Sequence, residues 1–307
     1  MLNQKPIVVV GSINMDLVAS AHHIPAPGET ILGTGFETHP GGKGANQAVA
    51  IGRLGYPVQM IGLLGSDDYG KHLREGLNSA GVDTSGVGTL PGSSGIALIT
   101  VASTGENSIV VASGANMQVL PAYLDAHADL IRNAGLVLSQ LEIPLESVLH
   151  LAQLCAEAKV PLILDPAPAQ NIPQEIFPLV AWLTPNETEA SYYLDGKSLS
   201  PAAAAAAAAF FAKGVQGVIL KQGSQGSYLA TSAGETSAIP PFPVKAVDST
   251  GAGDCFNGAF ATALMLGNSP IESARFASAA SAISVTRAGA QASMPTMAEV
   301  RSLLQSQ

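Results

Sequence analysis

The chain has 307 residues, of which 47% are hydrophobic and only 12% are charged, and its formal net charge is −9. This length and apolar content can bury one large core or two small ones, which excludes an extended disordered protein. The few Lys and Arg residues form no basic stripe, so binding to nucleic acid or to an anionic membrane is disfavoured, and small polar ligands are the expected partners.

The first residues, MLNQKPIVVVGS, lead directly into a strand-like run, and no later window holds about 18 uninterrupted apolar residues. The two cysteines, Cys155 and Cys255, have neither metal-site spacing nor the pattern of a disulfide framework. Both features predict a cytoplasmic protein in a reducing compartment. Cys255 could be an activated thiol at a helix start, but a small buried packing residue is the preferred interpretation.

Short apolar runs rich in β-branched residues alternate with amphipathic stretches. Buried strands are predicted at 7–12, 58–64, 136–140, 161–165, 181–184 and 217–221. Helices are predicted at 45–55, at 120–133, at 201–214 with its alanine run 202–209, and at 254–266. This alternation predicts an α/β fold with a doubly covered, mostly parallel sheet.

Two segments interrupt the alternation. Residues 15–40 and 94–112 are turn-rich and strand-like, and the second resembles a hairpin closed around residues 104–107. No linker of Pro, Gly or Ser separates two domains, so we expect a single α/β domain over 1–307 with a small β-sheet lid inserted from about 15–40 and 94–112. The strand edges of this lid would be exposed, and covering them with a second copy predicts a homodimer.

Polar residues and glycines follow the predicted strands at their carboxyl ends, where parallel sheets bind ligands. They are Asn14, Asp16, Glu142, Asp165, Asn186, Glu189, Gly223 and Gly226. Each alone could end a strand or cap a helix. Their agreement along the sheet predicts a ligand site at this edge.

The stretch 248–258 reads DSTGAGDCFNG and opens into an apolar run. Gly251, Ala252 and Gly253 have almost no side chain, so their backbone N–H groups can converge on an oxyanion at a helix N-terminus. Asp254 could simply cap that helix. Beside an anion hole, however, a carboxylate can take a proton from a hydroxyl while charge builds on a transferring phosphoryl group.

Two better known phosphate motifs are absent from the sequence. The lysine of PGGKGANQ is followed by glycine, so there is no Walker-type loop, and GSINMD stands where a dinucleotide fingerprint would follow the first strand. Phosphate binding is therefore expected to use another design.

The motifs GSINMD, PGGKGANQAVA, LTPNETEA, AVDSTGAGDCFNG and VTRAGAQASMP span essentially the whole chain. As a set they resemble the ribokinase-like carbohydrate kinase family. The resemblance implies ATP-dependent phosphorylation of a sugar hydroxymethyl group, and the close GSINMD and PGGKGAN matches favour D-ribose, giving ribose 5-phosphate. Fructokinase, nucleoside kinase and ketodeoxygluconate kinase activities remain alternatives, followed by a non-catalytic sugar-binding regulator and a hydride-transferring oxidoreductase.

The resemblance also implies roles for individual residues. Asp254 is the implied base, with Gly251, Ala252 and Gly253 stabilising the transferring phosphate. The implied sugar ligands are Asn14, Asp16, Gly42, Lys43, Asn46, Glu142 and Asp254. The implied nucleotide contacts are Asn186, Gln222, Gly223, Ser224, Gln225, Gly226, Ser227 and Gly253. Asn186 and Glu189 match the N-x-x-E element that orients Mg²⁺ through water.

A monovalent cation, K⁺, is the implied activator. Its implied ligands are Asp248, Thr250, Ser284, Arg287, Gly289 and Ser293. Without the resemblance, an ion pair between Asp248 and Arg287 would be nearly as good an explanation. The chain departs from the family at Lys221-Gln222, where threonine-leucine is expected, and this leaves the triphosphate contacts open.

Overall fold

A nine-stranded sheet forms the centre of the computed structural model, which describes residues 4–194 and 203–306. Its strand order is β13-β12-β11-β10-β9-β8-β1-β4-β5. The strands are β1 (Ile7–Val10), β4 (Val58–Gly65), β5 (Val82–Leu90), β8 (Leu136–Ser139), β9 (Leu162–Leu164), β10 (Trp182–Leu183), β11 (Gly217–Lys221), β12 (Ser227–Thr231) and β13 (Thr236–Ile239). β12 pairs antiparallel with both β11 and β13, and the other pairings are parallel.

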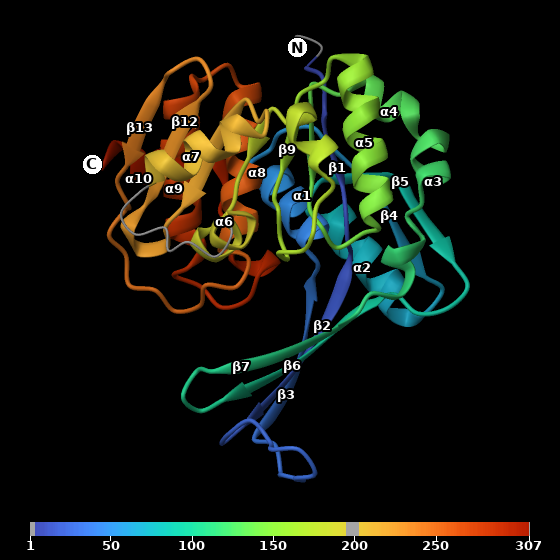
Figure 1. Ribbon diagram of the computed structural model, residues 1–307. Helices are drawn as coiled ribbons and strands as arrows, with labels where there is room; N and C mark the ends of the chain where they lie inside the picture. Colours follow the sequence, from blue (N-terminus) through green and yellow to red (C-terminus); the bar gives the residue numbers. More distant parts are fainter. Residues whose placement is uncertain (1–3, 195–202, 307) are drawn as a thin grey trace.

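Helices cover both faces of this sheet (Figure 1). One face is covered by α1 (Lys43–Arg53), α2 (Asp68–Ser79), α8 (Ala252–Met265), α9 (Pro270–Ser284) and α10 (Met297–Gln305). The other is covered by α3 (Pro121–Ala126), α4 (Ala128–Asn133), α5 (Leu145–Ala158), α6 (Glu187–Tyr193) and α7 (Ala203–Ala212). Strand β1 serves both cores, because Ile7 and Val9 pack on the first face and Val8 and Val10 on the second. The predicted doubly covered, mostly parallel sheet is therefore confirmed.

The six predicted strands correspond to β1, β4, β8, β9, β10 and β11, several of them one or two residues shorter. The predicted helix 120–133 was wrong as one element, because it is broken at His127 into α3 and α4. The His127 side chain donates from Nδ1 to the Tyr123 carbonyl at 2.9 Å, the acceptor that an unbroken helix would give to the His127 backbone N–H. The alanine-rich helix is α7, and residues 201 and 202 lie outside the described residues.

The predicted lid segments form a separate four-stranded sheet, which projects from the α/β body as an arm (Figure 1). Its order is β3-β2-β6-β7, from β2 (Asn14–Ala21), β3 (Gly35–Gly41), β6 (Gly95–Ala102) and β7 (Asn107–Ala112). The predicted hairpin is the β6–β7 turn. Large apolar side chains remain exposed on this sheet, among them Phe36, Leu98, Ile109, Val110 and Val111.

Both cysteines are buried, on opposite faces of the large sheet. Cys155 of α5 belongs to one hydrophobic cluster and Cys255 of α8 to the other. Burial raises the pKa of each thiol to about 12, so the packing interpretation of Cys255 holds. Across the described ranges, no helix combines the length and apolar character needed to cross a membrane.

Candidate active site

The predicted anion-hole turn lies at the N-terminus of α8. Gly251 is the N-cap, and its φ of 72° is in the left-handed region that favours glycine. The Ala252 N–H already donates to the Ser249 carbonyl at 3.1 Å. The N–H groups of Gly253 and Asp254, which begin the helix, have no hydrogen-bond partner among the described residues. These two donors point out of the helix end, where an anion would meet them.

Asp254 is buried, and its side chain does not cap α8. Its Oδ2 accepts a hydrogen bond from Asn46 Nδ2 at 2.9 Å, and its Oδ1 accepts one from Gln47 Nε2 at 3.1 Å. Burial raises the pKa of Asp254 to about 6, against the lowering effect of Lys43. A carboxylate with this pKa is ionised at neutral pH and is a better proton acceptor than an exposed one.

The start of α1 brings the predicted sugar ligands toward Asp254. Gly42 is the N-cap of α1 with φ 86°, and a Cβ there would lie 2.7 Å from the backbone nitrogen of Asn14. Glu142 accepts a hydrogen bond from the Lys43 backbone N–H at 3.2 Å. Burial alone would lower the pKa of the Lys43 ammonium, but the surrounding carboxylates, first of all that of Asp254, raise it. Lys43 is therefore a cation held inside an acidic pocket.

Asn14 and Asp16 lie on β2, where the small sheet leaves the body. Asn14 accepts a hydrogen bond from Asn116 Nδ2 at 2.7 Å. Burial and the nearby Glu142 raise the pKa of Asp16 to about 6. A cavity of about 610 Å³ opens beside Asn14 and Glu142 under the small sheet. Of the predicted sugar ligands, Asn14 and Glu142 line this cavity, and Asp16 and Lys43 interact through their charges with Glu142 and Asp254.

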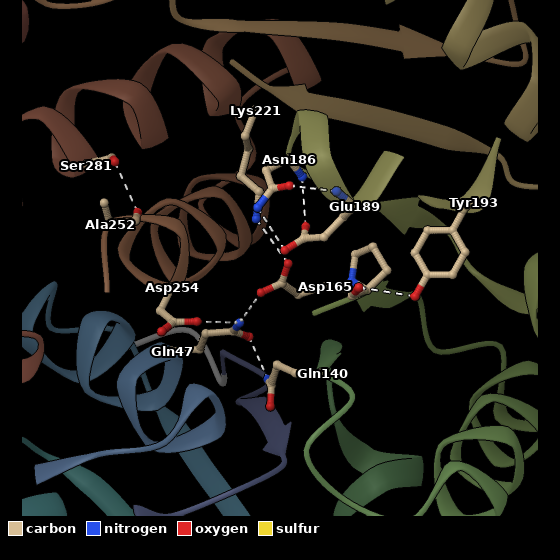
Figure 2. A network of polar contacts seen from close by, with 11 residues as sticks. Gln47, Gln140, Asp165, Asn186, Glu189, Tyr193, Lys221, Ala252, Asp254 and Ser281 are labelled. Atoms are coloured by element: carbon tan, nitrogen blue, oxygen red, sulfur yellow. Dashed lines mark hydrogen bonds and ion pairs between the residues drawn. The ribbon is translucent and has the colours of Figure 1, made fainter. Parts of the chain in front are cut away.

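Asp165 was predicted at the ligand-binding edge without a role, and Lys221 and Gln47 were not among the predicted site residues. Asp165, after β9, accepts hydrogen bonds from Lys221 Nζ at 3.0 Å and from Gln47 Nε2 at 3.1 Å (Figure 2). Lys221 Nζ also lies 3.4 Å from the position that a Cβ would take on Gly253. The ammonium of Lys221 is therefore at the predicted anion hole. The strand-end position of Asp165 and the unusual Lys221 were visible in the sequence, but their contact was not.

Asn186 and Glu189 form a reciprocal cap at the start of α6 (Figure 2). The Asn186 backbone N–H and Nδ2 donate to the two Glu189 carboxylate oxygens at 2.8 and 2.9 Å, and the Glu189 N–H donates to Asn186 Oδ1 at 2.8 Å. Each of these oxygens keeps a further lone pair. A hydrated Mg²⁺, which needs few direct protein ligands, fits such a pair.

The predicted nucleotide turn follows β11. Gly223–Gln225 forms a single 3₁₀ turn closed by a hydrogen bond from the Gln222 N–H to the Gly226 carbonyl at 2.8 Å. Gly223, Ser224 and Gln225 are exposed, whereas Ser227 is buried in β12. Lys221 connects this turn to the Gly253 region.

The predicted cation ligands come from two segments that the fold brings together. Asp248 accepts hydrogen bonds from Thr250 N and Oγ1 at 2.9 and 2.7 Å and from Gly289 N at 2.8 Å. Burial would raise the pKa of Asp248, but these bonds lower it. The alternative of an ion pair with Arg287 is wrong, because Arg287 pairs with Glu299. The hydroxyls of Ser284 and Ser293 donate to local carbonyls.

A buried carboxylate with a raised pKa, close to the Lys221 ammonium and to N–H groups of a helix N-terminus that are unpaired among the described residues, suits the transfer of a phosphoryl group to an alcohol. The pfkB family carbohydrate kinase profile matches residues 4–297. The chain belongs to this family of carbohydrate kinases.

Several ribokinases are similar to this chain in sequence and in structure. A ribokinase of Bacillus subtilis is 44% identical over 300 residues, covering 97% of this chain and 99% of its own. One from Haemophilus influenzae is 41% identical, with 98% and 99% covered. The crystal structure of a Thermotoga maritima ribokinase matches with a TM-score of 0.90 at 40% identity, covering 98% of this chain and 99% of that one. An Arabidopsis thaliana ribokinase complexed with ribose and ATP matches with a TM-score of 0.92 at 38% identity, with the same coverage.

Proposed function

We propose that this protein is an ATP-dependent ribokinase, which transfers the γ-phosphoryl group of ATP to the 5-hydroxyl of D-ribose. The observation that carries the proposal is Asp254, a buried carboxylate with a pKa of about 6 at the start of α8 beside free backbone N–H groups. Ribokinases at 38 to 44% identity over nearly the full chain, one of them in a structure complexed with ribose and ATP, support this choice of substrates.

In this mechanism, Asp254 accepts the proton of the sugar hydroxyl as that oxygen attacks the γ-phosphorus. The N–H groups of Gly253 and Asp254 donate to the transferring phosphoryl oxygens. The turn at Gly251, which has no side chain, lets the backbone come close to these oxygens. Lys221 adds a positive charge at the same place, since its Nζ is near Gly253. Asp16 is suited to two adjacent sugar hydroxyls, because a carboxylate has an acceptor oxygen for each.

The test is a coupled kinase assay with ATP and a panel of D-ribose, 2-deoxyribose, fructose, 2-keto-3-deoxygluconate and nucleosides. We expect the highest kcat/KM with D-ribose. A higher kcat/KM with another acceptor would replace ribose as the substrate within the kinase class. No turnover with any acceptor, combined with measurable sugar binding, would favour the non-catalytic regulator.

We also assign Mg²⁺ to Asn186 and Glu189, acting through water. Its chemistry is the neutralisation of phosphate charge. Asn186→Ala with Glu189→Ala should raise the Mg²⁺ concentration needed for half-maximal rate, whereas Glu187→Ala, on the same helix start, should not.

We further propose that K⁺ activates the enzyme by binding near Asp248 and Thr250. The Asp248 carboxylate, kept ionised by its hydrogen bonds, joins the two segments that would surround the ion. Initial rates should be higher in K⁺ than in Na⁺ or a bulky organic cation at matched ionic strength, with turnover affected most. Equal rates in all three salts would rule out the site and leave the kinase assignment standing.

The small sheet is proposed to act as a lid of one domain spanning 1–307, and as the contact between two copies. Apolar residues lie on both of its faces, with Ile109 and Val111 on the face of Asp16 and Leu98 and Val110 on the other. A sheet of this kind is stabilised when a second copy covers one face. Sedimentation analysis should give a dimer that Leu98→Glu with Val110→Glu converts to a monomer. The cytoplasmic location expected from the sequence remains a prediction.

A further inference from the structure

One buried amide joins the carboxylates of Asp254 and Asp165. Gln47 Nε2 donates to Asp254 Oδ1 and to Asp165 Oδ2, each at 3.1 Å (Figure 2). Gln47 lies on α1, and its side chain is fully buried. An amide nitrogen has two hydrogens, so each carboxylate receives one of them.

The orientation of this amide is determined by its two carboxylate partners, which in their ionised form can only accept hydrogen bonds, and a third partner contacts its oxygen. Gln47 Oε1 accepts a hydrogen bond from Gln140 Nε2 at 2.7 Å. Rotating the amide by half a turn would place its oxygen against two acceptors and its nitrogen against a donor. Because no water competes in a buried site, such a mismatch costs several of these hydrogen bonds at once. The two carboxylates therefore fix Gln47 with both hydrogens toward them, and Gln140 donates to the oxygen that is left.

The consequence for Asp254 is that both of its oxygens are held from α1. Asn46 donates to Oδ2 and Gln47 to Oδ1, so the carboxylate plane cannot rotate without breaking one of the two bonds. Asn46 was already among the predicted sugar ligands, whereas Gln47 was not, and its side chain hydrogen-bonds to Asp254, Asp165 and Gln140. A buried glutamine could serve packing alone, but its two donated bonds both end on carboxylates of the site.

We propose that Gln47 is a positioning residue of the phosphoryl transfer, which orients the Asp254 carboxylate and favours its ionised form, and that Gln140 holds Gln47 in place. The inference rests on the proposed function of Asp254 as the base. It extends that function to two residues that lie behind the site.

The charges around Asp254 determine what loss of this hydrogen bond would do. Lys43 from α1 lowers the pKa of Asp254, and Asp165, paired with Lys221, raises it. Asp16 faces it from the small sheet. The other ionisable neighbours are Glu142 and Glu189, both near Lys43, and the Cys255 thiol. Gln47 is neutral, so its replacement by an apolar residue removes a donor to the ionised form while leaving every charge unchanged, and the Asp254 pKa must rise.

The test compares Gln47→Met, which keeps the length but has no donor, with the wild type on whichever acceptor the wild type phosphorylates best. We expect kcat to fall by roughly tenfold or more, KM for both substrates to change less than about threefold, and the acid limb of the pH profile of kcat/KM to move up by about one pH unit. Gln140→Met should change the same quantities in the same direction, by less.

Gln59→Met is the matched control. Gln59 Nε2 also donates to a carboxylate, that of Asp83 at 3.0 Å, but at the surface and away from the site. This variant should have wild-type kcat and an unmoved profile. The proposal is overturned if Gln47→Met keeps wild-type turnover, or if it loses turnover and substrate affinity equally with an unmoved acid limb, as a packing defect would.

If Gln47→Met does not fold, Gln140→Met replaces it as the test. Gln140 has no hydrogen bond to Asp254, so its substitution acts on the carboxylate through Gln47, and the changes in kcat and in the acid limb should have the same direction and a smaller size. Failure of the proposed function has a different signature. In that case the wild type would phosphorylate no acceptor, or Asp254→Asn would keep wild-type turnover, before any glutamine variant is compared.

Discussion

The two halves of the site are built in different ways. On the proposed sugar side, Asn14, Asn46, Gln47 and Asp254 are buried. Asn46 and Gln47 donate hydrogen bonds to Asp254, and Asn14 accepts one from Asn116. On the nucleotide side, residues 223–225 and 249–250 are exposed turns that offer mainly backbone groups. We therefore expect recognition of the sugar to depend on individual side chains fixed in advance, and recognition of phosphates to depend on backbone conformation and a few charges. Single substitutions should accordingly have larger and more specific effects on the sugar side.

The largest effect is expected at the point where the halves meet. Asp254→Asn removes the base while keeping the volume of the side chain, so kcat should fall by about a hundredfold or more, with ATP affinity nearly unchanged. Steady-state rates with isothermal calorimetry measure both. A variant that keeps most of its turnover would show that the base lies elsewhere.

Asp254 should also lower the free energy of unfolding when it is ionised, because its carboxylate is buried. Its pKa is raised from 3.8 to about 6, so between these pH values the native state holds a proton that the unfolded state has lost, and stability falls as pH rises through this window. The free energy of unfolding of Asp254→Asn minus that of the wild type should therefore increase by roughly 2 to 3 kcal/mol between pH 4 and pH 7.5, at about 1.4 kcal/mol per unit of pKa difference.

Urea unfolding at several pH values measures this difference. Asp83→Asn is the control of opposite sign, because hydrogen bonds from Ser85 and Gln59 lower the pKa of Asp83 despite partial burial. A difference between Asp254→Asn and wild type that is constant with pH would contradict the raised pKa.

Asp16 tests the sugar side alone. Asp16→Ala leaves two sugar hydroxyls without an acceptor, so sugar affinity should weaken by about ten- to a hundredfold, with ATP affinity within about twofold. Glu37→Ala, an exposed carboxylate on the neighbouring strand β3, should change neither. Unchanged sugar binding by calorimetry for Asp16→Ala would move the pocket elsewhere.

Lys221 gives the smallest of the expected effects and tests the nucleotide side. Its side chain is 14% exposed and reaches both Asp165 and the Gly253 region. Lys221→Met should raise the KM for ATP by roughly tenfold, because one charge among several phosphate contacts is lost, and should change sugar affinity less. Lys213→Met is the control, because Lys213 is a half-buried lysine after α7 whose Nζ donates to Gln174. A larger loss in sugar than in ATP affinity would reverse the comparison of the two halves.

The sequence predicted the central strands well, because parallel strands covered on both faces form short apolar runs such as residues 7–10 and 217–221. It did not predict β5, β12 and β13, which lie toward the edges of the sheet and mix polar with apolar residues. The division of the helix 120–133 depends on one side-chain contact of His127, which composition does not reveal.

The candidate site divides in a similar way. Glycine-rich turns and strand-end carboxylates are local patterns, so Asp254 and its neighbours were recognisable from sequence. The link from Asp254 through Gln47 to Asp165 and Lys221 joins residues up to 207 positions apart, and only the folded chain brings them together. Gln47 is the last residue of the PGGKGANQ motif, and nothing in the sequence distinguished it from a residue that only packs in the core.

The placement of the two cysteines gives the fold a pair of built-in chemical reporters. Cys155 and Cys255 sit in α5 and α8, against opposite faces of the large sheet, with thiol pKa values of about 12. An alkylating reagent can reach either sulfur only after its own face opens. The relative rates at which the two sulfurs are alkylated, read by peptide mass spectrometry, would therefore reveal whether the two helical layers detach together or one before the other.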